Sequence, residues 1–130
     1  MADIIRKIKF NSAGLVPAIV QDSQTREVLM MAYMNAEAIE KTLATGKMHF
    51  YSRSRKTLWL KGETSSHIQE VRAVFLDCDS DTLLFQVSQR GGACHEGYRT
   101  CFFKQLNSDK GDFTIVGEKV FDPEKIYRKK

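Results

Sequence analysis

The chain has 130 residues, of which 42% are hydrophobic, so it can bury one core and is not of disordered composition. No run approaches the roughly 18 apolar residues of a membrane helix, and the N-terminus lacks the basic-then-apolar layout of a signal peptide, so we expect one cytoplasmic domain covering residues 1–130. The net charge of +4 allows an anionic partner without requiring nucleic acid.

In chain order, the sequence predicts mostly strands. Apolar runs predict the first two strands at 15–20 and 28–34, and a turn begins at Asp22 between them. We interpret the Met and Tyr side chains of the second run as core. Further strands are expected at 48–51, 58–60, 68–76, 82–87 and 99–106. We expect a last hairpin between 113–116 and 120–121, and then one helical turn after Pro123.

One amphipathic helix is expected at 36–45. Asn35 suits its N-cap, and Gly46 suits its C-terminal stop. The apolar face of this helix is expected to consist of Ala36, Ile39 and Leu43. The expected fold class is therefore α+β and predominantly β, a compact β-rich domain with one or two short helices.

An acidic segment separates two apolar runs. On an extended backbone, Asp77, Asp79 and Asp81 would share one face, and Cys78 would lie on the other. Carboxylates suit Mg²⁺ or Ca²⁺, whereas a thiol suits zinc, so the segment could serve two metals. Residues two apart on a strand lie roughly 6–7 Å apart, so the carboxylates reach one ion only if the segment bends at Ser80 or waters bridge. The structural alternative is a plain acidic turn.

The three cysteines Cys78, Cys94 and Cys101 are an odd number, which argues against a closed disulfide framework. Three thiolates would leave zinc an open fourth position, which is typical of a catalytic site, where zinc lowers the pKa of water to about 7. His95, next to Cys94, would then be a fourth ligand or a general base. The structural alternative makes the cysteines buried packing residues and His95 a surface residue.

A basic segment at 50–65 suits a phosphorylated ligand. Its cationic side chains, set among hydroxyls, are Arg53, Arg55, Lys56 and Lys61. Arginine binds phosphate in a bidentate manner, Gly62 permits close backbone approach, and Trp59 can stack on a base. The structural alternative is a solvated basic hairpin with a core tryptophan.

Together, these segments resemble the phosphoribosyl-AMP cyclohydrolases of histidine biosynthesis. The resemblance covers most of 15–103, in the stretches 15–22, 28–35, 50–65, 77–81 and 93–102. It implies an intertwined, zinc- and magnesium-dependent homodimer that hydrolyses the N1–C6 bond in the adenine ring of phosphoribosyl-AMP. Because nothing of domain size follows residue 103, we do not expect the fused pyrophosphohydrolase domain of some bacterial members.

The resemblance also implies roles for individual residues. The zinc ligands, shared between subunits, would be Cys78, Cys94 and Cys101. The magnesium ligands would be Asp77, Asp79 and Asp81. Our candidates for binding the substrate are Arg53, Arg55, Trp59, Lys61, Gly62 and Glu63. His95 is our candidate for moving protons. Ser66 stands where the family usually has glycine, and it would strain the turn if that position needs a positive φ.

Three other classes of protein remain open on the residues alone. A zinc nucleotide deaminase also attacks C6 of adenine, but its signature includes C-x-x-C, which this chain lacks. A zinc-stabilised nucleic-acid module would need a fuller basic face and a fourth protein ligand. A plain structural domain would bind no zinc, so metal analysis of the purified protein separates it from the others.

Overall fold

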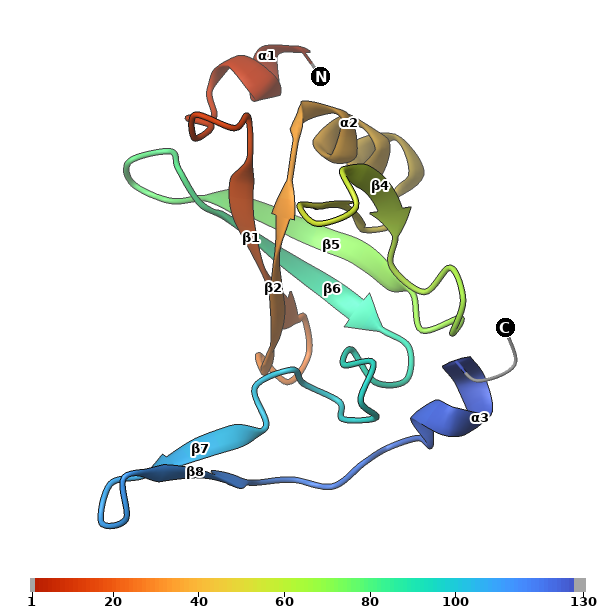
Figure 1. The fold of residues 1–130 in the computed structure, drawn as a ribbon. Coiled ribbons are helices and arrows are strands. Elements are labelled where there is room, and N and C mark those ends of the chain that lie inside the picture. Colours follow the sequence, from red (N-terminus) through yellow and green to blue (C-terminus); the bar gives the residue numbers. More distant parts are fainter. Residues whose placement is uncertain (1, 128–130) are drawn as a thin grey trace.

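The computed structural model describes residues 2–127 and is built on a four-stranded sheet with the strand order β2-β1-β6-β5 (Figure 1). Its strands are β1 (Val16–Asp22), β2 (Val28–Met34), β5 (Gln69–Leu76) and β6 (Leu83–Gln89). Neighbouring strands are antiparallel except β1 and β6, which run parallel in the centre. Two antiparallel hairpins complete the strands: β3 (His49–Ser52) with β4 (Thr57–Leu60), and β7 (Lys104–Asn107) with β8 (Asp112–Ile115).

The described helices are short: α1 (Ala2–Arg6), α2 (Ala36–Thr45) and α3 (Pro123–Tyr127). The α2 prediction is confirmed at both ends. The Asn35 side chain accepts a hydrogen bond from the Ala38 N–H at 2.8 Å, and Gly46 ends the helix with a φ of 75°. The turn predicted after Pro123 is α3, whereas α1 was not predicted. Within residues 2–127, no helix is long and apolar enough to cross a bilayer.

The buried face of α2 differs from the predicted one. It consists of Ala38, Ile39 and Thr42, and Leu43 is only partly buried. Thr42 can be buried because its hydroxyl accepts a hydrogen bond from the His49 N–H at 2.9 Å at the start of β3. A polar residue in the helix therefore fixes how α2 sits on the β3–β4 hairpin.

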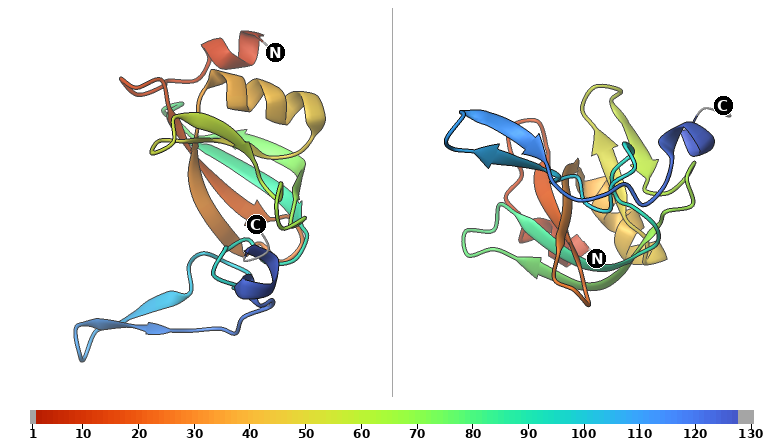
Figure 2. Two further views of the ribbon diagram at one scale, coloured as in Figure 1. Left: turned by 45° about the vertical axis from the view of Figure 1, so that its right-hand side comes forward. Right: turned by 90° about the horizontal axis from the view of Figure 1, so that it is seen from below.

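The core lies between the four-stranded sheet and a layer made of α2 and the β3–β4 hairpin (Figure 2). Alternate residues of the two central strands are buried in it, namely Val16, Ala18, Val20, Leu83, Phe85 and Val87. Met30 and Met34 of β2 are also buried, which confirms them as core, but Met31 is exposed. The observed fold is α+β and mostly β, as predicted from the alternating apolar runs.

Two predictions for the C-terminal part were wrong. The strand expected at 99–106 begins only at Lys104, because Thr100 and Cys101 form hydrogen bonds to the backbone of β2 instead. The last hairpin pairs β8 with β7, and not with 120–121. The β7–β8 hairpin projects from the body of the molecule, and the chain then returns along its lower side to α3 (Figure 1).

The β5–β6 hairpin separates the two chemically interesting parts of the chain. At one end, Leu76 pairs with Leu83 across the acidic turn, residues 77–82. At the other end, β6 leads into the cysteine loop, residues 91–101. The seven residues of β6 span about 20 Å, so these two segments lie far apart in one chain.

Candidate active site

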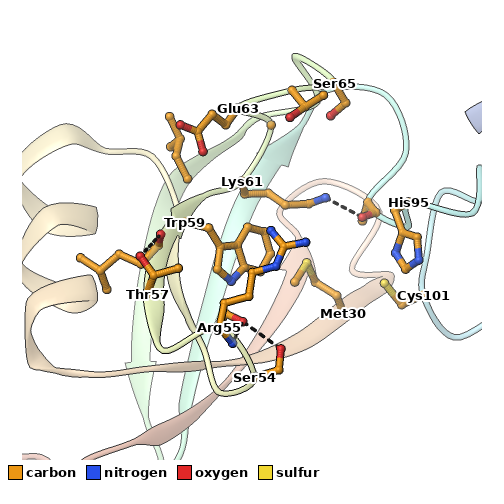
Figure 3. A pocket seen from close by; sticks show the side chains of 16 residues that line it. Met30, Ser54, Arg55, Thr57, Trp59, Lys61, Glu63, Ser65, His95 and Cys101 are labelled. Atoms are coloured by element: carbon orange, nitrogen blue, oxygen red, sulfur yellow. Dashed lines mark hydrogen bonds between the residues drawn. The ribbon is translucent and has the colours of Figure 1, made fainter. Parts of the chain in front are cut away.

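A cleft of about 660 Å³ lies between the β3–β4 hairpin with its following loop and the cysteine loop (Figure 3). Five of the six residues predicted to bind substrate line it: Arg55, Trp59, Lys61, Gly62 and Glu63. His95 and Cys101 line it as well, at the opposite end from Ser54 and Thr57. A cleft of this size accommodates a nucleotide-sized ligand.

Arg53, the sixth predicted substrate residue, does not line this cleft. Its guanidinium lies 4.1 Å from the centroid of the Tyr33 ring, a cation–π contact that joins the tip of the β3–β4 hairpin to β2. The structure therefore gives Arg53 a contact within the fold, whereas Arg55 faces the cleft.

Two of the three cysteines meet beside the cleft. Cys94 is buried, and its thiol lies close enough to that of Cys101 to affect its ionisation. Cys101 is exposed as a residue, but burial of its sulfur, followed by the proximity of Cys94, raises the pKa of the Cys101 thiol to about 12. The Cys101 thiol therefore resists ionisation unless a nearby cation compensates its charge. This pair therefore has the donor chemistry of a site for a thiophilic metal.

Lys61 places a buried ammonium group next to the two cysteines. It is 7% exposed, and its ammonium donates a hydrogen bond to the Ala93 carbonyl oxygen at 2.7 Å. Burial lowers the pKa of Lys61, whereas the charges of Cys101 and Cys94 raise it. No ion pair among the described residues joins Lys61 to a carboxylate. A buried ammonium needs a negative partner, and Cys94 and Cys101 would supply it if a bound metal held them as thiolates.

The cysteine loop is clamped to the start of β2. Arg99 forms ion pairs with Asp22 and, at 3.0 Å, with Glu27. The Cys101 N–H donates a hydrogen bond to the Leu29 carbonyl oxygen at 2.7 Å. The sequence analysis missed this clamp, because Asp22 and Arg99 are 77 residues apart and no local pattern relates them.

Asp22 also caps the β1–β2 turn, as its turn position predicted. Burial raises the pKa of the Asp22 carboxyl, but hydrogen bonds from the backbone of Thr25 and Gln24, together with the charge of Arg99, outweigh burial and leave the pKa lowered. Asp22 is thus ionised at neutral pH and holds Arg99 in place.

The acidic turn brings the three aspartates together. β5 ends at Leu76, and the chain bends with Ser80 at a φ of 67°, which is the first of the two alternatives expected for this segment. Carboxylate oxygens of Asp77, Asp79 and Asp81 all lie within 4.8 Å of one another. These exposed oxygens have the donor chemistry of a site for a hard divalent cation.

The pKa values of Asp77 and Asp79 are shifted in opposite directions. Desolvation raises the pKa of Asp77, but hydrogen bonds from the backbone N–H groups of Asp81 and Thr82 leave it lowered. Hydrogen bonds with the Asp81 and Asp77 side chains, followed by their negative charges, raise the pKa of Asp79. Asp77 therefore also stabilises the turn, as expected for a plain acidic turn. Asp79 is the carboxyl whose ionisation the neighbouring carboxylates make less favourable.

Cys78 does not join the other two cysteines in this chain. It is exposed in the acidic turn, at the far end of β6 from Cys94 and Cys101. Among residues 2–127, the only group of three or more metal-ligating side chains is the three aspartates. A single chain thus presents two thiols at one end of β6 and the third at the other.

In the loop after β4, both Gly62 and Ser66 have a positive φ. Ser66 has a φ of 65°, so this position does need the left-handed conformation in which glycine is unstrained. Gly62 has a φ of 89°, and a Cβ atom there would lie 2.6 Å from the Ile68 nitrogen. The group that approaches Gly62 closely is therefore the backbone of the same loop at Ile68.

Comparisons with known proteins match this chain to one family. The family model for phosphoribosyl-AMP cyclohydrolase matches residues 30–103. A protein of that name from Pelotomaculum thermopropionicum is 63% identical over 95% of this chain and 95% of its own length. Those from Methanoregula boonei and Salinibacter ruber are each 56% identical, the first over 94% of this chain and 95% of its own length, the second over 91% of each. The resemblance is confirmed: this chain belongs to the phosphoribosyl-AMP cyclohydrolase family.

Proposed function

We propose that this chain is a phosphoribosyl-AMP cyclohydrolase, a hydrolase that opens the adenine ring of its substrate by breaking a C–N bond of a cyclic amidine. The family match covers the residues of the cleft from Met30 to Cys101. The observation that carries the proposal is that one cleft combines a surface suited to a phosphorylated purine with the Cys101 thiol, which lies next to the buried Cys94 and to the buried ammonium of Lys61.

The β3–β4 side of the cleft would bind the substrate. Arg55 presents a guanidinium, and Ser54 and Thr57 present hydroxyls, which together suit a phosphate group. Trp59 lies between these residues and Lys61 and offers a face for the purine (Figure 3). Lys61 is buried and hydrogen-bonded to the cysteine loop, so its contribution would be to the thiol pair rather than to phosphate.

Zinc fits the thiol pair, with Cys94 and Cys101 as ligands from one chain and Cys78 of a second copy as the third. When bound in an open three-thiolate site, zinc lowers the pKa of a coordinated water to about 7 and so supplies a nucleophile. Magnesium fits the carboxylates of Asp77, Asp79 and Asp81, which are hard oxygen donors. Because Cys78 lies within the acidic turn, a second copy would deliver both sets of ligands together.

His95 would move the protons of the reaction. It is exposed on the cysteine loop and faces the cleft, next to Cys94. Hydrolysis adds the oxygen of water to C6, leaves one water proton on the exocyclic nitrogen and delivers the other to N1 as the N1–C6 bond breaks. The products of this cleavage are a carboxamide and a formamidine on one ring-opened molecule, and no ammonia leaves. Histidine is the side chain suited to such proton transfers near neutral pH.

Exposed apolar side chains support a dimer. Val74, Phe75 and Leu76 are 41%, 49% and 38% exposed on the edge strand β5, immediately before the acidic turn. Phe113 and Ile115 are 66% and 62% exposed on the β7–β8 hairpin, and a two-stranded hairpin is marginal in water by itself. A second copy that covers β5 would also reach Cys78, so burial of this surface and completion of the site would occur together.

Product identity tests the proposed function. Purified protein with zinc and Mg²⁺ is incubated with phosphoribosyl-AMP, and the ring-opened product and ammonia are both quantified. The proposal predicts stoichiometric ring-opened product without ammonia, and no comparable turnover of AMP. Stoichiometric ammonia, or turnover of AMP at a similar rate, would identify a deaminase instead.

A further inference from the structure

A short C-terminal segment lies against the cysteine loop. This segment, the strap, consists of residues 119–121 and precedes α3. The Val120 N–H donates a hydrogen bond to the Gly97 carbonyl oxygen at 2.7 Å, and Lys119 forms an antiparallel bridge with Tyr98. The matched family segment ends at residue 103, so the strap lies outside it.

Two glycines of the cysteine loop have no space for a side chain. At Gly92 the space is filled both by the strap and by the Tyr98 carbonyl oxygen, which would lie 2.6 Å from a Cβ atom, and at Gly97 the strap fills it. A Cβ atom on Gly92 would lie 2.9 Å from the Phe121 ring, and one on Gly97 would lie 2.6 Å from the Phe121 carbonyl oxygen. Gly97 also has a φ of 104°, which side chains rarely adopt. The Phe121 ring is therefore packed against Gly92, and the Phe121 backbone against Gly97. These two glycines lie at the two ends of the turn that carries His95.

The same ring contacts the other side of the cleft. Phe121 and His67 pack edge to face, with ring centroids 4.6 Å apart. His67 follows the loop whose residues from Gly62 to Ser65 line the cleft, and a Cβ atom on Gly91 would lie 2.5 Å from its imidazole. Phe121 thus joins the substrate side of the cleft to the cysteine loop through His67.

We propose that Phe121 is a positioning residue, which holds the turn carrying His95 in register with the substrate side of the cleft. This inference rests on the proposed function, because His95 acts there on the bound substrate. Phe121 touches neither the substrate nor the thiol pair in this role. It acts by fixing the distance between the two walls, and small displacements of a catalytic group are costly, since about 1 Å can lower the rate by about 10²-fold.

The test compares Phe121→Ala and the conservative Phe121→Leu with Phe10→Ala. Phe10 is a half-buried aromatic residue that packs on the main core, so its truncation removes the same atoms away from the cleft. For Phe121→Ala we expect kcat to fall by about 10- to 100-fold and KM to change by less than about threefold. Phe121→Leu should recover most of kcat, and Phe10→Ala should keep a parent-like kcat while the protein remains folded.

Amide hydrogen exchange of residues 92–98 gives a second measurement that does not depend on activity. Exchange in this segment should accelerate in Phe121→Ala and stay parent-like in Phe10→Ala. Parent-like kcat and exchange in Phe121→Ala, or equal losses of kcat in Phe10→Ala, would overturn the inference. If the parent protein does not hydrolyse phosphoribosyl-AMP, the proposed function fails, while exchange still decides whether Phe121 holds the loop.

Discussion

The two ends of β6 differ in how the chain holds its candidate metal ligands. At the cysteine loop, Cys94 is buried, and the ion pair of Arg99 with Asp22 fastens the loop to the sheet. At the acidic turn, Cys78 and the three aspartates are exposed, and the described hydrogen bonds to their carboxylates come from within the turn. One end is thus a pair of thiols fastened to the sheet, and the other is an exposed group of thiol and carboxylate donors.

Within residues 2–127, the fold brings two thiols together and leaves the third at the opposite end of β6. The third thiol lies about 20 Å away along β6, beside an exposed apolar edge. Under the proposed three-thiol site, a second copy would supply the third thiol, and each end of β6 can be tested separately.

The largest expected effect is the loss of a thiol ligand. Cys94→Ala, Cys101→Ala and Cys78→Ala should each lose tightly bound zinc and nearly all turnover, because a site with two thiolates binds zinc far less tightly. Zinc content and turnover of the purified variants check this. Parent-like zinc and activity in Cys78→Ala would show that the acidic turn contributes no ligand and that the two ends are unrelated.

Removing the candidate proton-transfer group should have the next largest effect. His95→Ala should lower kcat by about 10²- to 10⁴-fold, which is typical for a general acid–base residue, while the zinc content stays that of the parent. Steady-state kinetics combined with metal analysis measure both. A loss of zinc from His95→Ala would instead identify His95 as a ligand.

A change in the acidic turn should have a smaller and metal-specific effect. Asp79→Asn should weaken activation by added Mg²⁺ and leave the zinc content unchanged, because it removes one hard oxygen donor but no thiol. Asp109→Asn, an exposed aspartate in the turn of the β7–β8 hairpin, is the matched control. If both variants respond to Mg²⁺ like the parent, the acidic segment is only a turn.

The smallest expected effect concerns the clamp that makes the cysteine end rigid. The pKa of Asp22 is lowered in the folded protein, so its ionisation stabilises the fold above its unfolded pKa of about 3.9. This stabilisation is lost as the pH falls through the folded pKa. Asp22→Asn should therefore cost about 1–2 kcal/mol of unfolding free energy at pH 7, and the deficit should shrink below about pH 4. Denaturant unfolding across this pH range measures it, and a deficit independent of pH would contradict the clamp.

Local patterns were sufficient to predict most elements of the fold. The apolar runs located the strands of the main sheet, and Asn35 and Gly46 located both ends of α2, because caps and periodicity act within a few residues. The pairing of β7 with β8 was mispredicted, since several short apolar runs competed and the hairpin projects without burying them.

The site was predictable in its residue types but not in its connections. The sequence pointed to the basic segment and the cysteines. The phosphate contact of Lys61 stays a prediction, and the sequence did not indicate that its ammonium is hydrogen-bonded to the Ala93 carbonyl oxygen. The contacts of Arg99 with Asp22 and of Phe121 with His67 likewise join segments distant in sequence. Such contacts depend on how loops pack after folding, and neither propensity nor spacing encodes them.

Mixing two inactive variants tests the shared site most directly. Cys78→Ala protein and Cys101→Ala protein are combined, subunits are allowed to exchange, and turnover of phosphoribosyl-AMP is followed. In a mixed dimer one site keeps all three thiols, so activity should rise to about a quarter of the parent value, because about half of the dimers are mixed and each holds one complete site. No recovery in a sample shown to contain mixed dimers, or full activity of a monomer at working concentration, would contradict the account.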